Sequence, residues 1–250
     1  MLSIASVQAS LLLSMDFAAK ECDFAEGEVL AFDKPLHWTS FDLVAKVRYT
    51  ICHKIGKKKL KVGHSGTLDP LATGVVVVCT GHKTKLIDQL QYDDKEYVAT
   101  LQLGATTPSF DMEHPVDQTY PTAHITRTLI DEVIPQFLGE QWQVPPMYSA
   151  VWVDGKRAYQ MARKGEMVEL KPKLLVIDEI DVLSFDQQAM LLTIRVVCSK
   201  GTYIRALARD IGERLGSGAY LTALRRTRVG NIHIEDCMTI DNFLLMMNNE

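Results

Sequence analysis

The sequence predicts an α+β fold in which helices flank a long, mixed, mostly antiparallel sheet. The 250-residue chain is 47% hydrophobic, enough to bury a substantial core. Segments with the two-residue period of a strand and segments with the 3.6-residue period of a helix both occur. They follow one another without the regular alternation that builds a parallel sheet, which favours the α+β class.

The first third of the chain predicts a strand, a helix and a second strand. Residues 27–34 contain the apolar run of the first strand. Thr39 and Ser40 offer N-caps, and apolar residues then recur every three or four positions up to Ile55, which predicts a helix. The run Val75–Val78 is too short and too β-branched for a helix, so we expect a central buried strand.

The middle of the chain predicts shorter elements. Residues 83–90 predict a short helix, and residues 97–103 alternate apolar and polar positions as a half-buried strand does. Residues 105–122 are polar and predict a loop. Residues 125–138 have a helical pattern that restarts at Pro135.

The remaining segments predict a strand pair and a further helix. Two prolines keep residues 144–149 extended, and residues 157–164 predict a short helix. Residues 174–183 and 191–198 are expected to pair as strands. An apolar stripe predicts a helix over residues 203–215.

One loop concentrates the features of a functional site. Residues 62–74 place a single carboxylate, Asp69, among three glycines and directly ahead of the buried strand. Pro70 disfavours helical geometry at Asp69, and the glycines allow a ligand or another backbone to approach closely. The loop therefore predicts an acid held in one pose above the sheet; an ordinary Asp-Pro turn with a solvated carboxylate is the alternative.

The charge distribution says more about partners than the net charge of -4 does. From Leu43 to Leu68 the chain has no acidic residue. The basic residues of this window are Lys46, Arg48, Lys54, Lys57, Lys58, Lys59 and Lys61. A protein that is acidic overall can carry a basic face that binds nucleic acid, although a solvated lysine turn is the alternative.

Several classes of protein are disfavoured by composition. The five cysteines show no C-x-x-C spacing, which fits a reducing cytosol, so we expect a cytoplasmic protein. The seven histidines show no metal-ligand spacing, and no apolar segment is long enough for a membrane span. Residues 1–14 lack the basic start and clear cleavage site of a signal peptide, and residues 1–26 are interpreted as an N-terminal extension.

The Asp69 loop resembles the signature G-H-[TS]-G-[TA]-L-D-P-x-A-x-G of the TruB family of tRNA pseudouridine synthases. Four further segments resemble family motifs in the same order along the chain. They are 33–40 (D-K-P-x-G-x-[TS]-S), 95–97 (K-x-Y), 198–205 (C-[SG]-x-G-T-Y-[IV]-R) and 220–227 (L-R-R). His37 stands where the first of these motifs has glycine, so it must avoid or tolerate a positive φ.

The resemblance implies a role for each of these motifs. Asp69 is the expected catalytic residue, and Arg205 is its expected partner, since a guanidinium orients an ionised carboxylate. Tyr97 is expected to stack on the target base, and Tyr203 to line the pocket around it. Taken alone, Tyr97 could equally be a core tyrosine and Arg205 a surface residue of an amphipathic helix.

Further residues are expected at the substrate. Leu224 would pack against the target base, His64 would fill the place of the extruded base, and Lys34 would support the catalytic loop. Without the resemblance, His64 is an ordinary turn residue and Lys34 a surface lysine. The residues expected at the RNA backbone are Lys57, Lys58, Lys59, Lys61, Arg225 and Arg226. The two arginines serve either phosphate contacts or structure.

The resemblance also implies the pseudouridine-synthase fold, with a catalytic cleft across the middle of the sheet. Residues 27–235 would form the catalytic domain, and residues of roughly 105–170 would include an insertion that grips the RNA arm. Trp152 and Pro108 depart from the family pattern there, which leaves the details of RNA gripping open. Residues 236–250 are expected to be a short tail, too short for the RNA-binding PUA module of most bacterial members.

The implied activity is conversion of the T-loop uridine at tRNA position 55 to pseudouridine. This isomerisation breaks an N–C glycosidic bond and makes a C–C bond to the same ribose. It needs a base held out of its stack and a carboxylate beside C1′, acting as nucleophile or as base. We expect no metal and no cofactor, the tRNA T-arm as partner, no membrane, and a monomer without an obligatory protein partner.

Two other functions are considered from the sequence. An RNA chaperone that folds tRNA would share every RNA contact and would differ only in not needing Asp69. A nucleotide enzyme using the glycine loop is disfavoured, because no P-loop Lys-Ser/Thr follows the glycines. For either RNA-binding function, affinity should be more salt-sensitive than a net charge of -4 indicates.

Replacing Tyr97 by Phe tests whether stacking alone is its role. Phe keeps the aromatic face, and base–aromatic stacking is worth roughly 1–3 kcal/mol, so we expect pseudouridine formation within about threefold of wild type. Initial rates on an unmodified tRNA transcript check this. A much larger loss would show that the hydroxyl group is needed.

Overall fold

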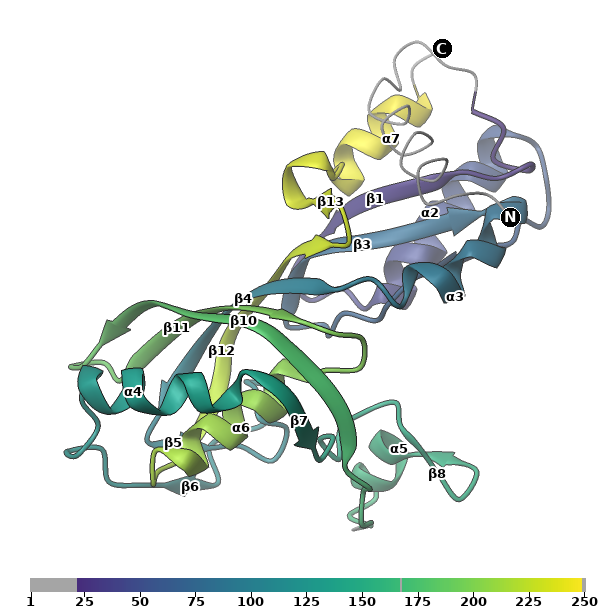
Figure 1. Ribbon diagram of the computed structural model, residues 1–250. Helices are drawn as coiled ribbons and strands as arrows, with labels where there is room; N and C mark the ends of the chain where they lie inside the picture. The colour runs from purple at the N-terminus through teal and green to yellow at the C-terminus, as the bar shows by residue number, and fades with distance from the viewer. Residues whose placement is uncertain (1–21, 167, 249–250) are drawn as a thin grey trace. The chain divides into compact units, whose positions relative to one another are not determined.

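The computed structural model describes residues 22–166 and 168–248, and the chain divides into two compact units. The first unit contains the chain up to Lys95 together with residues 225–250, and the second contains residues 96–224. The chain passes between the units within two strands, β4 (Lys95–Leu103) and β12 (Ala219–Val229) (Figure 1). Among the described residues, no helix has both the length and the apolar character needed to cross a membrane.

The first unit is a small sheet with helices beside it. Its elements are β1 (Val29–Lys34), α2 (Ser40–Lys54), β2 (Val62–His64), β3 (Ala72–Thr80), η2 (Gly81–Leu86), α3 (Ile87–Leu90), β13 (Ile232–His233), η4 (Ile234–Asp236) and α7 (Ile240–Asn248). The strands pair in the order β1-β3-β12, with β2 on β3 and β13 on β12. β1 and β3 are antiparallel, in a register that joins Val29 to Cys79 and Lys34 to Gly74.

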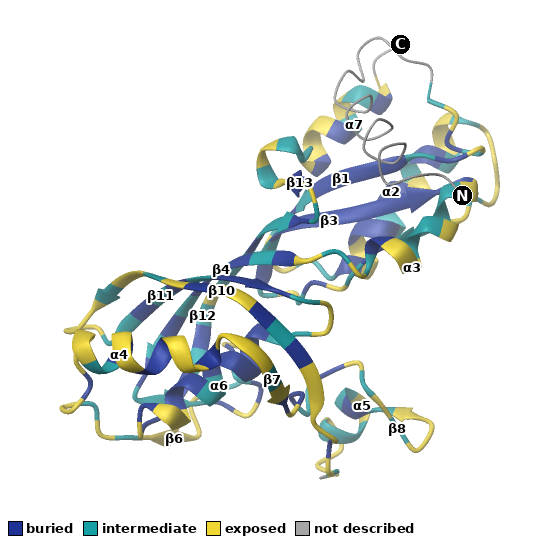
Figure 2. Ribbon diagram, viewed as in Figure 1, coloured by how far each residue is buried: buried dark blue, intermediate teal, exposed yellow. Residues whose placement is uncertain are grey.

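The core of this unit forms around β3. Val75–Val78 are at most 1% exposed, as expected for a strand buried on both faces (Figure 2). α2 begins as predicted, because Thr39 accepts a hydrogen bond from the Asp42 backbone and the Asp42 carboxylate accepts one from the Thr39 backbone. Helix α7 packs on the same sheet, where Phe243 meets Phe32 edge-to-face with ring centroids 5.4 Å apart.

The second unit contains the larger part of the sheet. Its elements besides β4 and β12 are β5 (Ala105–Thr106), β6 (Gln118–Thr119), α4 (Arg127–Val133), η3 (Ile134–Phe137), β7 (Gly139–Gln143), β8 (Trp152–Val153), β9 (Lys156–Arg157), α5 (Ala158–Ala162), β10 (Lys173–Asp186), β11 (Leu191–Cys198) and α6 (Ile204–Arg214). The main strands pair in the order β12-β4-β11-β10-β7. β10 is antiparallel to both β11 and β7.

The strand and helix periods of the sequence agree with the burial of β4 and α6 in this unit. In β4, Tyr97, Ala99, Leu101 and Leu103 are buried and the residues between them are half-buried, which is the alternation read from the sequence. The predicted 203–215 helix is α6, whose apolar stripe is buried. The α+β class and the mostly antiparallel sheet are therefore confirmed.

Several segments differ from the expectation, including β2, β7 and the β8–β9 pair, where no strand was predicted. Three others are informative. The predicted loop 105–122 contains a short hairpin, β5 paired with β6, so that assignment was wrong in part. Residues 219–229 form β12, which the arginine-rich sequence did not reveal, and within the expected short tail residues 240–248 form the packed helix α7. In each case contacts with distant residues stabilise a segment whose own pattern is weak.

Gly74 is the glycine whose substitution should disturb the first unit most. Its φ is +110°, and a Cβ atom there would lie 2.1 Å from the backbone oxygen of Arg226. We expect Gly74→Ala to lower the free energy of unfolding by about 3 kcal/mol or more, since positive φ and overlap both oppose the methyl group.

Gly56 provides the matched control. Its φ is also positive, at +65°, but nothing lies within 4 Å of the position that an added methyl group would take. Gly56→Ala should therefore cost only about 1–2 kcal/mol. Urea unfolding of both variants checks the difference, and equal losses would contradict the steric argument.

Candidate active site

The loop that carries Asp69 is held at its backbone on both sides of the carboxylate. Ser40, the first residue of α2, accepts a hydrogen bond from the Leu68 backbone N–H (2.8 Å) and donates to the Leu68 carbonyl (3.1 Å). On the other side, the His37 N–H donates to the Pro70 carbonyl (2.8 Å). His37 adopts a positive φ of 67°, so of the two alternatives left open by the sequence it tolerates this conformation. The half-buried Asp69 side chain is thus presented from a fixed backbone.

Arg226 fills the inside of this loop. It is 3% exposed, and its guanidinium donates to the carbonyls of Val75 (2.7 Å), Gly66 (3.1 Å) and Thr67 (3.4 Å). Carbonyls that point inward need such donors, because an unpaired buried carbonyl is costly. Of the two roles that the sequence left open for Arg226, this placement favours the structural one.

Lys34 is a fully buried cation in the same unit. It is 0% exposed, and its Nζ donates to the carbonyls of Pro35 (2.9 Å) and Trp38 (2.6 Å). Burial lowers the pKa of Lys34 to about 8; the negative charge of Asp69 opposes this shift and the positive charge of Arg226 adds to it. Lys34 therefore supports the turn before α2 and interacts electrostatically with Asp69.

His64 lies at the end of β2, at the start of the Asp69 loop. Its Nδ1 accepts a hydrogen bond from the Gly66 N–H at 3.2 Å, so a neutral ring carries its proton on Nε2. Burial lowers the pKa of His64, and the charge of Arg226 lowers it further. At neutral pH the residue is thus an uncharged, flat ring.

Arg225 points to the other side of β12 and forms an ion pair. Its guanidinium donates to both carboxylate oxygens of Asp33, at 2.8 and 3.2 Å, and to Thr73 Oγ1 at 3.1 Å. The side chain remains 41% exposed. The lysines predicted at the RNA backbone, Lys57, Lys58, Lys59 and Lys61, are exposed.

In the second unit, Arg205 connects α6 with two loops. It is 5% exposed and donates to the carbonyls of Ser109 (3.1 Å) and Tyr148 (2.9 Å). Its Nε lies 3.6 Å from Oδ2 of Asp111, which is itself buried. The sequence did not mark Asp111 as a site residue. It is the one acid in residues 107–111, the segment in which Pro108 departs from the family pattern.

The predicted site residues fall into two groups. Those of the first unit are Lys34, Lys57, Lys58, Lys59, Lys61, His64, Asp69, Arg225 and Arg226. Those of the second unit are Tyr97, Tyr203, Arg205 and Leu224. Because Asp69 and Arg205 belong to different units, their pairing stays a prediction.

The two departures from the family pattern have local partners. The guanidinium of Arg157 lies 4.2 Å above the centre of the exposed Trp152 ring, across the β8–β9 hairpin. The exposed Pro108 sits in a loop closed by a hydrogen bond from Thr107 Oγ1 to the Asp111 carbonyl (2.7 Å). Both residues are compatible with the local fold.

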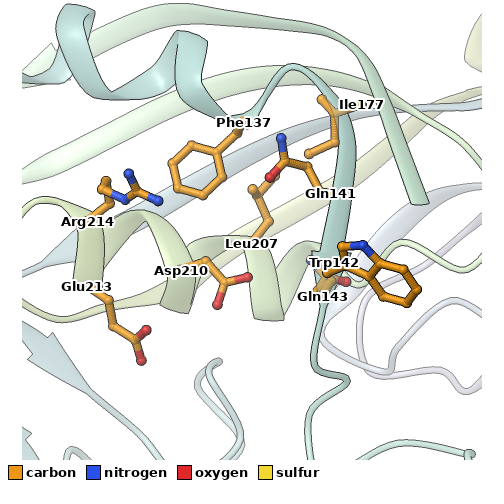
Figure 3. Close-up of a pocket in the computed structure, with 9 residues that line it drawn as sticks. All are labelled: Phe137, Gln141, Trp142, Gln143, Ile177, Leu207, Asp210, Glu213 and Arg214. Carbon is orange, nitrogen blue, oxygen red and sulfur yellow. The ribbon is translucent and has the colours of Figure 1, made fainter. Parts of the chain in front are cut away.

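A cavity of about 390 Å³ lies elsewhere in the second unit (Figure 3). Its lining residues are Phe137, Gln141, Trp142, Gln143, Ile177, Leu207, Asp210, Glu213 and Arg214. Burial raises the pKa of Asp210, against the effect of Arg209, whose Nη2 is 2.6 Å from the carboxylate. The lining includes no residue predicted for the site, so the cavity is a separate feature.

Two family models match the chain. The model described as TruB family pseudouridylate synthase (N terminal domain) matches residues 53–204. The model described as tRNA pseudouridylate synthase B C-terminal domain matches residues 205–250.

Individual proteins similar to this chain carry names that fit the two family models. The tRNA pseudouridine synthase B of Phocaeicola vulgatus is 64% identical over 221 residues, which is 88% of this chain and 93% of that protein. The tRNA pseudouridine synthase B of Bacteroides thetaiotaomicron is 65% identical over 223 residues, with the same two coverages.

Solved structures share the fold. A chain of a Cbf5-Nop10-Gar1 complex aligns with 88% of this chain at a TM-score of 0.64 and 29% identity. A chain of an H/ACA RNP bound to a substrate RNA containing 2′-deoxyuridine aligns with 88% of this chain at a TM-score of 0.62 and 27% identity. The present chain spans about half the length of each, 54% and 53%.

The buried Lys34 predicts a pH dependence of stability. Its pKa is about 8 in the folded protein and 10.5 without burial, so between these values the unfolded chain binds more protons and stability rises with pH. A shift of this size corresponds to a gain of about 3 kcal/mol over the whole window. Lys34→Met should remove this rise.

The measurement is urea unfolding at pH 7.5, 9 and 10 for wild type, Lys34→Met and the control Lys58→Met, which replaces an exposed lysine. The difference in unfolding free energy between wild type and Lys34→Met should grow with pH, and the control should follow wild type. Parallel curves for all three proteins would contradict the assignment.

Proposed function

The chain belongs to the TruB family of pseudouridylate synthases, and from this premise we propose that it isomerises the T-loop uridine at tRNA position 55 to pseudouridine. The observation that supports this most directly is the Asp69 loop, a single carboxylate with its flanking backbone held by Ser40 and His37. Relatives at 64% and 65% identity carry the name tRNA pseudouridine synthase B.

We assign the central chemical role to Asp69. The reaction detaches the uracil from C1′ through its nitrogen and rejoins it through carbon, without net oxidation or reduction. An ionised carboxylate beside the ribose can either attack C1′ or remove a proton from the sugar, and both routes need the acid in one pose. The buried cation Lys34 interacts electrostatically with the Asp69 carboxylate.

The other predicted residues supply what an extruded base needs. A base must leave its stack before its glycosidic bond can be reached. The neutral ring of His64 suits the space that the base vacates, and Tyr97 offers a stacking face at the start of β4. We assign Tyr203 and Leu224 to the walls of the base pocket and Arg205 to the orientation of Asp69.

We propose the tRNA T-arm as the bound partner. The exposed lysines at residues 57–61 and the half-exposed Arg225 provide positive charge for phosphate contacts that position the RNA. The chemistry needs neither metal nor cofactor in this proposal, and the protein acts as a monomer in the cytoplasm.

Asp69→Asn tests the proposed function. Wild type should form pseudouridine at position 55 of an unmodified tRNA transcript, and the variant should bind that transcript with similar affinity while its rate falls at least about a thousandfold. Single-turnover rates, filter binding and mapping of the modified position measure these quantities.

Asp94→Asn is the matched control, because Asp94 is an exposed acid of the first unit outside the proposed site. It should retain wild-type activity. An active Asp69→Asn variant, or a wild-type product at another position, would contradict the proposal.

A further inference from the structure

The side-chain amide of Gln143 pairs with the backbone of Tyr203 through two hydrogen bonds. Gln143 is the last residue of β7 and is 4% exposed. Its Oε1 accepts a hydrogen bond from the Tyr203 N–H (2.9 Å), and its Nε2 donates to the Tyr203 carbonyl (3.2 Å). Both the oxygen and the nitrogen of the amide are therefore hydrogen-bonded to the backbone of one residue.

That residue stands where helix α6 begins. Tyr203 occupies the N-cap position, with φ -100° and ψ 108°. Backbone N–H groups at a helix start have no partner within the helix, so Gln143 supplies one from a distant strand. The Tyr203 carbonyl also accepts the first helical hydrogen bond, from the Leu207 N–H at 3.0 Å. The peptide groups on both sides of Tyr203 are thereby fixed.

The same end of α6 carries Arg205. Its guanidinium reaches the Tyr148 carbonyl, and one turn later Arg209 donates to the Val144 carbonyl at 3.1 Å. The extended segment that starts at Gln143 is thus joined to α6 at three points. A change at Gln143 would act on the direction of the first turn, from which both Tyr203 and Arg205 project.

Strand pairing holds Gln143 itself in place. In the antiparallel register of β7 and β10, Gln143 lies opposite Lys173. Its neighbour Trp142 is 71% exposed, whereas Gln143 is buried; both line the cavity to which Leu207 of α6 also contributes (Figure 3). The alternation of a strand therefore directs the amide toward the helix start.

We propose that Gln143 is a positioning residue for the reaction: it fixes the Tyr203 peptide and thereby sets the Tyr203 ring and the Arg205 guanidinium for the target uridine. This inference rests on the proposed function, since it gives Tyr203 and Arg205 their roles at the base. Gln143 itself does not touch the substrate in this account.

Gln143→Glu is the decisive variant, because it replaces the amide NH₂ that donates to the Tyr203 carbonyl and keeps the rest of the side chain. The introduced carboxyl keeps the size of the amide and can still accept from the Tyr203 N–H. When ionised, it turns a negative oxygen toward the Tyr203 carbonyl. We expect the single-turnover rate at pH 8 to fall at least about thirtyfold, with the tRNA dissociation constant within about twofold of wild type.

The same variant should recover activity in mild acid. A protonated carboxyl has an O–H donor and again satisfies both Tyr203 groups, and burial raises the pKa of the introduced carboxyl. The ratio of variant to wild-type rate should therefore rise at least about fivefold between pH 8 and pH 6. A general loss of packing would not produce this recovery.

The charged side chains around position 143 are present in wild type and in every variant. Those that line the cavity beside Gln143 are Asp210, Glu213 and Arg214 of α6, Arg209 pairs with Asp210, and Lys173 lies opposite on β10. Since wild type contains the same groups, the rate ratio at each pH removes their contribution.

Two control variants complete the design. Gln143→Met fills the space without hydrogen bonds, so its rate should stay low relative to wild type at both pH values. Gln141→Glu changes the same residue type two positions earlier on β7, where the amide donates to the Gln136 and Leu138 carbonyls at an exposed turn. It should match wild type at both pH values, and near-UV circular dichroism should confirm folding of every variant.

The outcomes are distinguishable. A wild-type rate at pH 8 in Gln143→Met or in Gln143→Glu would overturn the inference. So would a loss in Gln143→Glu that is equal at pH 6 and pH 8, or a loss confined to RNA affinity. If wild type itself makes no pseudouridine in the T-loop, the proposed function fails instead. Loss at pH 8 with recovery at pH 6, absent from both controls, supports the positioning role.

Discussion

The first unit depends on a buried guanidinium. Arg226 comes from β12 and donates to three carbonyls that surround the Asp69 loop, so a loop without regular secondary structure still has its inward-facing carbonyls paired. The close approach of the two chain segments leaves no room for a side chain at Gly74, whose Cβ would overlap the Arg226 backbone. Fixing this loop fixes the carboxylate, and the proposed chemistry needs a carboxylate that does not move.

Burying that cation has electrostatic consequences for its neighbours. Lys34 is buried nearby; its own burial lowers its pKa to about 8, the charge of Asp69 opposes this shift, and the charge of Arg226 adds to it. The same environment lowers the pKa of His64, which keeps this ring neutral. A neutral ring suits contact with bases, and Lys34 interacts electrostatically with Asp69. In the proposed reaction, structural support and electrostatics would therefore come from the same residues.

The second unit holds its functional side chains through backbone contacts rather than through charge alone. Arg205 reaches the carbonyls of two loops and lies near Asp111, and Gln143 secures the residue at which α6 begins. In the reaction as proposed, no metal or cofactor would orient the substrate, so the protein backbone has to do so. Small errors in the placement of a reacting group are costly to rate, which is why such remote supports matter.

The sequence by itself determined the fold class, the strand alternation of β4 and the extent of α6, because each follows from a pattern among neighbouring residues, such as a period or a cap. The catalytic role of Asp69 is likewise predicted from a contiguous motif. The tertiary structure decided the rest. β12 is a strand because it pairs with β3 and β4, and its arginines hydrogen-bond to carbonyls and a carboxylate far along the chain. Phe243 of α7 packs on Phe32. Asp111 and Gln143 reach their partners only because α6 lies beside them. These contacts join residues separated by tens to hundreds of positions, and a local pattern contains no information about such partners.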